Sequence, residues 1–364
     1  MLTPQTRSQF RTLLDALTLT AADDRQDAII YMQTDQPDIH VTRSMFRTAV
    51  FQTAHALTQL GIQPGDLVII AHTQNLESIY LFWGALPPAP SLPCSPPSLK
   101  NSTPLSTWPT WPNWCASPTS APSSPPTNLS PQLAPQVTCP VYGSKQLTGN
   151  SDQFAINQTS PPIIPDKVAL LQHSSGTTGL QKGVALSHTA VLNQIAAYSD
   201  ALQLTSGDII VSWLPLYHDM GLIAGFLLPL IQGIPLVLMS PFDWVSHPAL
   251  LLKAIDKYQG NALLAAQLRL QPLRPPHPPS RQSRTLLASM HAFINCSEPV
   301  RHDSHQLFLE KFAANGVTPE MLAVSYAMAE NTFAVTQTAV GQTGPGRCDR
   351  PAGFRTHWLC ECCG

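Results

Sequence analysis

Proline density divides this chain of 364 residues into segments that can form regular structure and segments that cannot. Sixteen of the 36 prolines lie between Pro87 and Pro140, where Lys100 is the only charged residue. A second stretch, residues 263–291, holds four arginines and five prolines but no acidic residue. Because proline lacks an amide hydrogen and clashes inside a helix, we expect neither helices nor central strands in these stretches.

Two interpretations of the proline-rich stretches stay open. They can be disordered linkers, or they can come from a shifted reading frame that turns GC-rich codons into proline, serine and arginine. We favour the shifted frame, because a helix predicted over residues 76–86 stops abruptly at Pro87 and apolar sequence resumes without a capping signal at Phe293. The expected organisation is one domain over residues 1–343, with atypical segments at 87–150 and 263–291 and an atypical tail at 344–364.

The remaining sequence alternates between strand and helix patterns. Apolar runs at residues 29–32 and 39–41 flank a turn and predict a hairpin. Thr42 can cap the helix that follows, which ends at Gly61. The inward residues of that helix are expected to be Phe46, Val50, Ala54 and Leu57. Residues 67–70 form a continuous apolar run that is typical of a strand covered on both faces.

Strand–helix alternation continues downstream. We expect strand 168–172, helix 188–203, strand 209–213, helix 221–231, strand 235–239, and a helix that is capped by Ser246 and ends near Gly260. This pattern predicts an α/β fold with parallel-rich sheets flanked by helices, in which ligands bind outside the carboxyl ends of the strands. Residues 221–239 are strongly apolar but contain two prolines, so they indicate a buried helix, turn and strand rather than a membrane span.

A loop rich in glycine and hydroxyl groups follows the strand predicted over 168–172. Its residues of interest are Ser174, Ser175, Gly176, Thr177, Thr178, Gly179 and Lys182. Glycines let backbone N–H groups approach a ligand closely, while the hydroxyl groups and the lysine add donors, so the loop suits a polyphosphate. It is not a Walker A loop, because Lys182 is followed by Gly183 rather than by serine or threonine.

Four motifs in one order resemble those of the adenylate-forming (AMP-binding) enzymes, which include acyl-CoA synthetases and fatty-acyl-AMP ligases. They are the loop just described, residues 213–221 (WLPLYHDMG), residues 295–299 (NCSEP) and residues 326–330 (YAMAE). The sequence around the four motifs is most similar to that of fatty-acyl-AMP ligases and long-chain acyl-CoA synthetases. The resemblance implies the large N-terminal α/β domain of that family.

The resemblance also implies chemistry: ATP-dependent activation of a fatty acid to an acyl-adenylate with Mg²⁺, with CoA or an acyl carrier protein as the acceptors left open. It implies that the loop hydroxyl groups and Lys182 grip the phosphates, and that Glu330 holds Mg²⁺. It places Tyr326 on adenine, lines the edge of adenine with Asn295, Ser297 and Glu298, and sets His218 beside the acyl site. Lys182, His218 and Glu330 are thus the expected catalytic residues.

Some positions depart from the family pattern or have simpler explanations. Ala329 stands where the family usually has threonine, so no hydroxyl contact is expected there. His218 and Asp219 can alternatively form a structural pair, with the apolar run after them in the core. The family's C-terminal lid of roughly 100 residues should follow Glu330, but 34 residues remain, so we expect this chain to lack the lid and to be inactive or weakly active.

Charge and the N-terminal sequence argue against two other classes of protein, those that bind nucleic acid and those that are secreted. A formal net charge of −2 gives no reason to expect binding to nucleic acid, and the first residues lack the pattern of a secretion signal, so we expect a cytoplasmic protein. Two other functions stay open: a non-catalytic remnant that binds a nucleotide or an acyl group, and a scaffold whose proline-rich segments bind partner domains.

Overall fold

The protein is described by a computed structural model that covers residues 10–19, 24–70, 75–86, 140–144, 164–173, 183–266, 287–296, 300 and 302–341. Most of the atypical segment at 87–150 and the tail at 344–364 lie outside these residues, as does part of the segment at 263–291. The expected division into one domain with atypical segments therefore stays a prediction.

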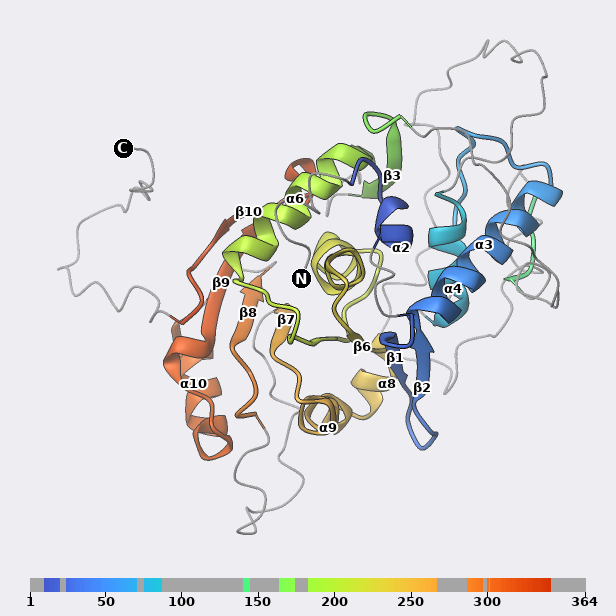
Figure 1. Cartoon of the computed structure of the whole chain (residues 1–364). Coiled ribbons are helices and arrows are strands. Elements are labelled where there is room, and N and C mark those ends of the chain that lie inside the picture. Colours follow the sequence, from blue (N-terminus) through green and yellow to red (C-terminus); the bar gives the residue numbers. More distant parts are fainter. Residues whose placement is uncertain are drawn as a thin grey trace, which may run out of the picture.

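The core of the fold is an eight-stranded sheet with the order β10-β9-β8-β7-β5-β6-β1-β2 (Figure 1). Its strands are β1 (Asp27–Met32), β2 (Ile39–Thr42), β5 (Ile210–Ser212), β6 (Leu236–Met239), β7 (Ala262–Ala266), β8 (Ala292–Cys296), β9 (Leu322–Ala327) and β10 (Ala334–Gln337). The strands from β9 to β1 pair in parallel, while β2 and β10 pair antiparallel at the two edges. The predicted α/β fold with a parallel-rich sheet is confirmed.

Helices cover both faces of this sheet (Figure 1). The larger ones are α3 (Arg43–Gln59), α4 (Leu76–Gly84), α6 (His188–Ala201), α9 (Ala249–Tyr258) and α10 (His302–Phe312). Short α2 (Asp15–Leu19) lies on the side of α6, whereas α9 and α10 lie on the opposite side. Alternate residues of β1 accordingly enter two different cores, Ile29 and Tyr31 on one face and Ile30 and Met32 on the other.

The N-terminal hairpin and the helix after it form as the sequence predicts. Strands β1 and β2 pair antiparallel, and the Thr42 side chain accepts a hydrogen bond from the Met45 N–H at 3.2 Å, which caps α3. The helix ends before Gly61, whose φ of +84° is a conformation that glycine adopts without strain. The inward face differs in one position: Thr53 is buried, whereas Ala54 is only half-buried.

Thr53 lies inward because α4 packs closely there. A Cβ atom on Gly84 of α4 would come within 2.7 Å of the Thr53 side chain, so the missing side chain permits the approach. Helix α4 begins with a capping box, in which Asn75 and Ser78 each bond the backbone N–H of the other.

The strand expected over residues 67–70 does not form. Leu67 and Ile69 are 56% and 54% exposed, and no strand in the described part of the chain pairs with this run. An apolar run becomes a buried strand only when neighbouring strands satisfy its backbone and helices cover it. The apolar pattern of residues 67–70 was therefore not enough to predict a strand.

The strand expected over 168–172 forms, but outside the parallel sheet. Strand β3 (Val168–His173) pairs antiparallel with β4 (Gly183–Ser187) in a separate two-stranded sheet. Leu170 is buried while Leu171 is exposed, so only one face of β3 is covered, as is usual in antiparallel pairs. The predicted helix forms as α6 after β4, and Ser187 caps it by accepting the Ala190 N–H at 3.1 Å.

Residues 220–239 form the buried helix, turn and strand that the sequence predicts. A π-helix, η6 (Met220–Leu227), continues into α7 (Leu228–Gln232), and all thirteen of these residues are buried. Gly233, with a φ of +69°, turns the chain into β6. Within the described residues, no helix is long and apolar enough to cross a membrane.

Two further expectations were wrong. Ser246 does not cap a helix: it ends α8 (Pro241–Ser246), which Ser240 caps, and α9 begins after Pro248 without a side-chain cap. A break at His247, whose φ is −135°, separates the two helices. Residues 262–266 form the central strand β7 although most of them belong to the proline-rich stretch, because its first proline comes only at Pro272.

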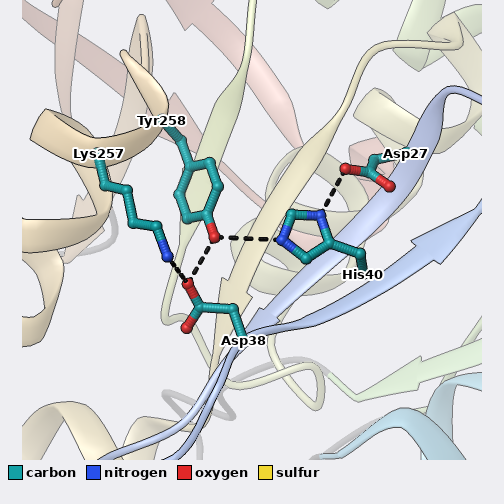
Figure 2. Close-up of polar contacts among 5 residues, drawn as sticks. All are labelled: Asp27, Asp38, His40, Lys257 and Tyr258. Atoms are coloured by element: carbon teal, nitrogen blue, oxygen red, sulfur yellow. Dashed lines mark hydrogen bonds and ion pairs between the residues drawn. The ribbon is translucent and has the colours of Figure 1, made fainter.

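A polar cluster fastens the hairpin to α9 (Figure 2). Asp38 accepts hydrogen bonds from Lys257 Nζ and the Tyr258 hydroxyl, each at 2.5 Å. His40 lies between Tyr258 and Asp27, with its Nδ1 2.7 Å from the Asp27 carboxylate. We call these five residues the hairpin clasp.

Candidate functional site

Three of the four motifs follow strands whose carboxyl ends lie at one edge of the sheet. Strands β5, β8 and β9 end at Ser212, Cys296 and Ala327. Since these strands belong to one parallel array, the segments that follow them emerge on the same edge, which is where α/β folds bind ligands. This carboxyl edge is the candidate site.

The segment after β5 presents an aromatic residue and a histidine to solvent. Tyr217 is 75% exposed and His218 is also exposed, and their rings lie 4.8 Å apart between centroids. The carbonyl of His218 accepts the Leu222 N–H at 2.8 Å, which joins the segment directly to η6. The segment is thus held by the backbone while both rings stay accessible.

Gly221 explains why this segment can pass so close to η6. A Cβ atom at this position would lie 2.1 Å from the carbonyl oxygen of Pro215, well inside van der Waals contact. Every residue from Met220 to Leu227 is buried, so the apolar run after His218 belongs to the core. The interpretation of this run as core is confirmed.

Asp219 is a partly buried carboxylate at the start of η6. Its Oδ1 accepts the Met220 N–H at 2.8 Å. Burial raises the pKa of Asp219, the hydrogen bond from Met220 and the charge of His218 oppose that rise, and the negative charge of Glu330 adds to it. The segments that carry Asp219 and Glu330 follow β5 and β9 of one parallel array, so the second and fourth motifs lie at the same edge of the sheet.

Glu330 lies in the turn between β9 and β10, and this turn is firmly anchored. Phe333 is fully buried and packs edge-to-face on Tyr198 of α6, with ring centroids 5.1 Å apart. The Tyr198 hydroxyl donates to Gln337 of β10 at 3.0 Å. Glu330 itself is exposed, so a fixed turn presents its carboxylate at the carboxyl edge.

Thr332 holds the same turn in an unusual backbone conformation. Its φ is +68°, a region that β-branched residues rarely adopt. Its N–H bonds the Ala329 carbonyl at 2.9 Å, and the Met328 N–H bonds the Phe333 carbonyl at 2.9 Å. Backbone strain of this kind persists only where surrounding contacts determine it, and it is common at functional sites.

Tyr326 and Asn295 differ in accessibility. Tyr326, near the end of β9, is 60% exposed and can stack on a planar ligand. Asn295 in β8 is only 1% exposed, and its amide nitrogen lies 3.1 Å from Nε2 of His305 in α10. Its side chain is therefore engaged with α10 beneath the edge, and its expected role at adenine stays a prediction.

Comparison with known proteins identifies the family. A sequence model of the family described as "AMP-binding enzyme" matches residues 119–357, well over half of the chain. The chain belongs to the AMP-binding enzyme family. The family predicted from the four motifs is thereby confirmed.

Individual AMP-binding relatives share limited identity with this chain. It is 30% identical over 182 residues to a medium-chain-fatty-acid–acyl-carrier-protein ligase of Moorena producens, across 50% of this chain and 31% of that protein. It is 28% identical over 316 residues to a long-chain-fatty-acid–AMP ligase of Mycolicibacterium smegmatis, across 78% of this chain and 46% of that protein. The chain thus spans about a third to a half of these curated relatives.

A solved AMP-binding structure has the same fold. The fatty acyl-adenylate ligase of Legionella pneumophila, in complex with acyl adenylate and pyrophosphate, superposes with a TM-score of 0.73 at 22% identity. The superposition covers 94% of this chain and 59% of that protein. The predicted fold of the family's large N-terminal domain is confirmed.

Several residues expected in the AMP-binding site lie outside the described residues. These are Ser174, Ser175, Gly176, Thr177, Thr178, Gly179, Lys182, Ser297 and Glu298. The loop that carries the first seven begins and ends at the paired residues His173 and Gly183, where β3 and β4 meet. Their expected roles stay predictions.

Glu330 suits a hard cation. Among the described residues, no group of three or more histidine, cysteine or acidic side chains could enclose a metal ion. Mg²⁺ needs no such enclosure, because it is usually held by one or two carboxylates together with substrate phosphates and water. An exposed carboxylate in a fixed turn fits this requirement.

The sequence did not reveal one aromatic pair at this edge. Trp213 follows β5 and Trp244 lies in α8 after β6, and their rings stack with centroids 3.7 Å apart and planes 14° apart. Both indole N–H groups are buried without a hydrogen-bond partner among the described residues. The available signal was that Trp213 ends a strand predicted over 209–213 and that Trp244 follows the strand predicted over 235–239.

Proposed function

We propose that the protein activates a fatty acid with ATP to form an acyl-adenylate and pyrophosphate. The observation that carries the proposal is that the His218–Asp219 segment and Glu330 follow strands of one parallel array and therefore share its carboxyl edge. Membership of the AMP-binding family supports it, as do relatives that are named for ligating medium-chain and long-chain fatty acids.

Each residue has a role in this proposal. Hydroxyl groups at 174–178 and Lys182 bind the β- and γ-phosphates, with the loop held at its ends by β3 and β4. Glu330 binds Mg²⁺, which when bound neutralises the phosphate charge during the transfer. Tyr326 stacks on adenine, and His218 lies where the fatty-acid carboxylate meets the phosphate.

The names of the relatives also suggest which molecule accepts the acyl group from the acyl-adenylate. Relatives are named both as acyl-carrier-protein ligases and as fatty-acid–CoA ligases. We propose a thiol acceptor of one of these two kinds, a carrier-protein phosphopantetheine or CoA, since both attack an acyl-adenylate with a sulfur nucleophile.

Fatty-acid-dependent exchange of pyrophosphate into ATP tests the proposal, with acids from short to long chain. Lys182→Ala and Glu330→Gln should each lower the exchange rate by about 100-fold, because the first removes a positive charge from the departing pyrophosphate and the second removes the carboxylate that would hold Mg²⁺. Glu310→Gln, an exposed carboxylate of α10, is the matched control and should leave the rate unchanged. Exchange that survives both site variants would contradict the assignment.

The low activity expected from the sequence stays a prediction, and the same assay measures it. Binding of ATP without any exchange would instead favour a nucleotide-binding protein without catalysis.

A further inference from the structure

A cavity of about 380 Å³ lies at the amino ends of the parallel strands. Its lining includes Asp208 before β5, Asn261 before β7, His291 before β8 and Glu320 before β9. In a parallel array these positions share the edge opposite the carboxyl ends. The cavity is therefore separate from the acyl-adenylate site and independent of the proposed function.

The charges that line this cavity are acidic. Among the described residues of the lining, Asp208, Glu320 and His291 are ionisable and none is a lysine or an arginine. The hydrogen bond from the Thr318 side chain and that from the Glu320 backbone N–H hold the pKa of Glu320 below its ordinary value, so its carboxylate is charged at neutral pH. The lining thus carries negative charge.

Asp208 has an oxygen available for a ligand. Its side chain is 7% exposed, and its Oδ2 accepts the Thr205 N–H. Its Oδ1 lies 3.8 Å from Nδ1 of His291, beyond hydrogen-bond distance, and accepts no hydrogen bond from the rest of the described chain. This oxygen is not fully buried, so solvent or a ligand can reach it and donate a hydrogen bond to it.

Helix ends add to the negative potential. Helix α6 ends at Ala201, and its cap residue Leu202 lines the cavity. Helix α9 ends at Tyr258, three residues before Asn261 of the lining. The last carbonyl groups of a helix carry partial negative charge and favour cations. Helices that return antiparallel to the strands therefore make this edge attractive to a cation.

The side chains that line the cavity determine which kind of cation it can bind. Beside its carboxylates the cavity has both apolar and polar side chains in its lining. The apolar ones include Leu204, Met290, Ala292 and Met321, and the polar ones are Gln203, Asn261, His291 and Thr318. Ca²⁺ takes about six to eight oxygen ligands and Mg²⁺ is usually held together with substrate phosphates, whereas this lining offers two carboxylates. Apolar walls suit a hydrocarbon chain instead, and the volume is at the small end for ligand sites.

We propose that this cavity binds the alkylammonium ion of a small primary amine. The ammonium group donates to Asp208 Oδ1 and lies in the field of Glu320, while the alkyl chain packs on Leu204 and Met290.

The test is a titration of the full chain, labelled with ¹³C at its methionine methyl groups, with n-butylammonium chloride and with 1-butanol. Met290 and Met321 report on the cavity, whereas Met220 and Met328 report on the carboxyl edge. We expect saturable shifts of Met290 and Met321 with butylammonium, and binding of the uncharged alcohol at least about tenfold weaker.

Substitutions of the two carboxylates test which residues bind the ammonium group. Asp208→Asn should weaken butylammonium binding about tenfold, and Glu320→Gln about threefold, since an exposed charge contributes less. Glu320 is exposed, so its variant remains informative if Asp208→Asn fails to fold. Glu310→Gln, outside the cavity, should bind as the unaltered chain does. Equal affinity for alcohol and ammonium, shifts confined to Met220 and Met328, or no saturable shift would each overturn the proposal.

Discussion

At the scale of single residues, Gly221 has the least room of any glycine with described neighbours. An added methyl group would meet the Pro215 carbonyl oxygen at 2.1 Å, and backbone on both sides of the contact cannot yield cheaply. We expect Gly221→Ala to lower the free energy of unfolding by about 2 kcal/mol or more. Urea denaturation measures this.

Gly207→Ala is the matched control, because the nearest atom to an added Cβ there lies 3.8 Å away. Its free energy of unfolding should stay within about 0.5 kcal/mol of the unaltered chain. If both alanine variants proved equally stable, the close approach between Pro215 and η6 would be wrong.

At the scale of elements, the β9–β10 turn depends on Phe333. This side chain is fully buried against Tyr198, so Phe333→Ala should cost about 3 kcal/mol in the free energy of unfolding. Val335→Ala, whose side chain is 46% exposed on β10, should cost less than about 1 kcal/mol. Thermal or urea unfolding compares the two, and similar losses would show that the turn is not anchored through Phe333.

The hairpin clasp should be sensitive to acid. Burial raises the pKa of Asp38, but the hydrogen bonds from Lys257 and Tyr258 outweigh it and lower this pKa below the ordinary value of 3.8. A lowered pKa in the folded state means that the clasp stabilises the fold above the ordinary pKa. This stabilisation disappears as the pH falls through the lowered value.

Tyr258→Phe removes one of these hydrogen bonds and should cost about 1 kcal/mol at pH 7. The difference from the unaltered chain should shrink below about pH 4, because Asp38 is then being protonated in both proteins. Asp256→Asn, an exposed residue of the same helix, serves as control and should change little at any pH. The free energies of unfolding of Tyr258→Phe and of the unaltered chain, measured from pH 3 to 7, test this prediction. A difference between the two proteins that stays constant with pH would contradict the role of Asp38.

At the scale of the whole molecule, the sequence predicted elements whose formation depends on their own residues. The hairpin, α3, α6 and the buried run 220–239 have strong caps, turns and periodicity, and the structure has them all. The prediction of a strand at residues 67–70 was wrong because the burial of a strand depends on its neighbours. Strand β7 was missed because proline counts over a long window concealed five residues free of proline.

Motif order likewise predicted where the site lies, since segments that follow parallel strands must share an edge. It could not predict the direction of the Asn295 side chain, because every residue of β8 is buried and the other residues of the strand are apolar on both faces. Nor could it pair Trp213 with Trp244, whose stacking depends on how α8 folds back over the edge.

The position of β1 has a consequence for synthesis. Ile29 pairs in parallel with Leu236, so the first strand joins a partner that is made 207 residues later. At a ribosomal rate of about 5 to 20 residues per second, that partner follows after about 10 to 40 seconds. Throughout this interval Ile30 and Met32 have no α9 to cover them. The nascent hairpin is thus an apolar surface that chaperones should recognise until β6 and α9 leave the ribosome.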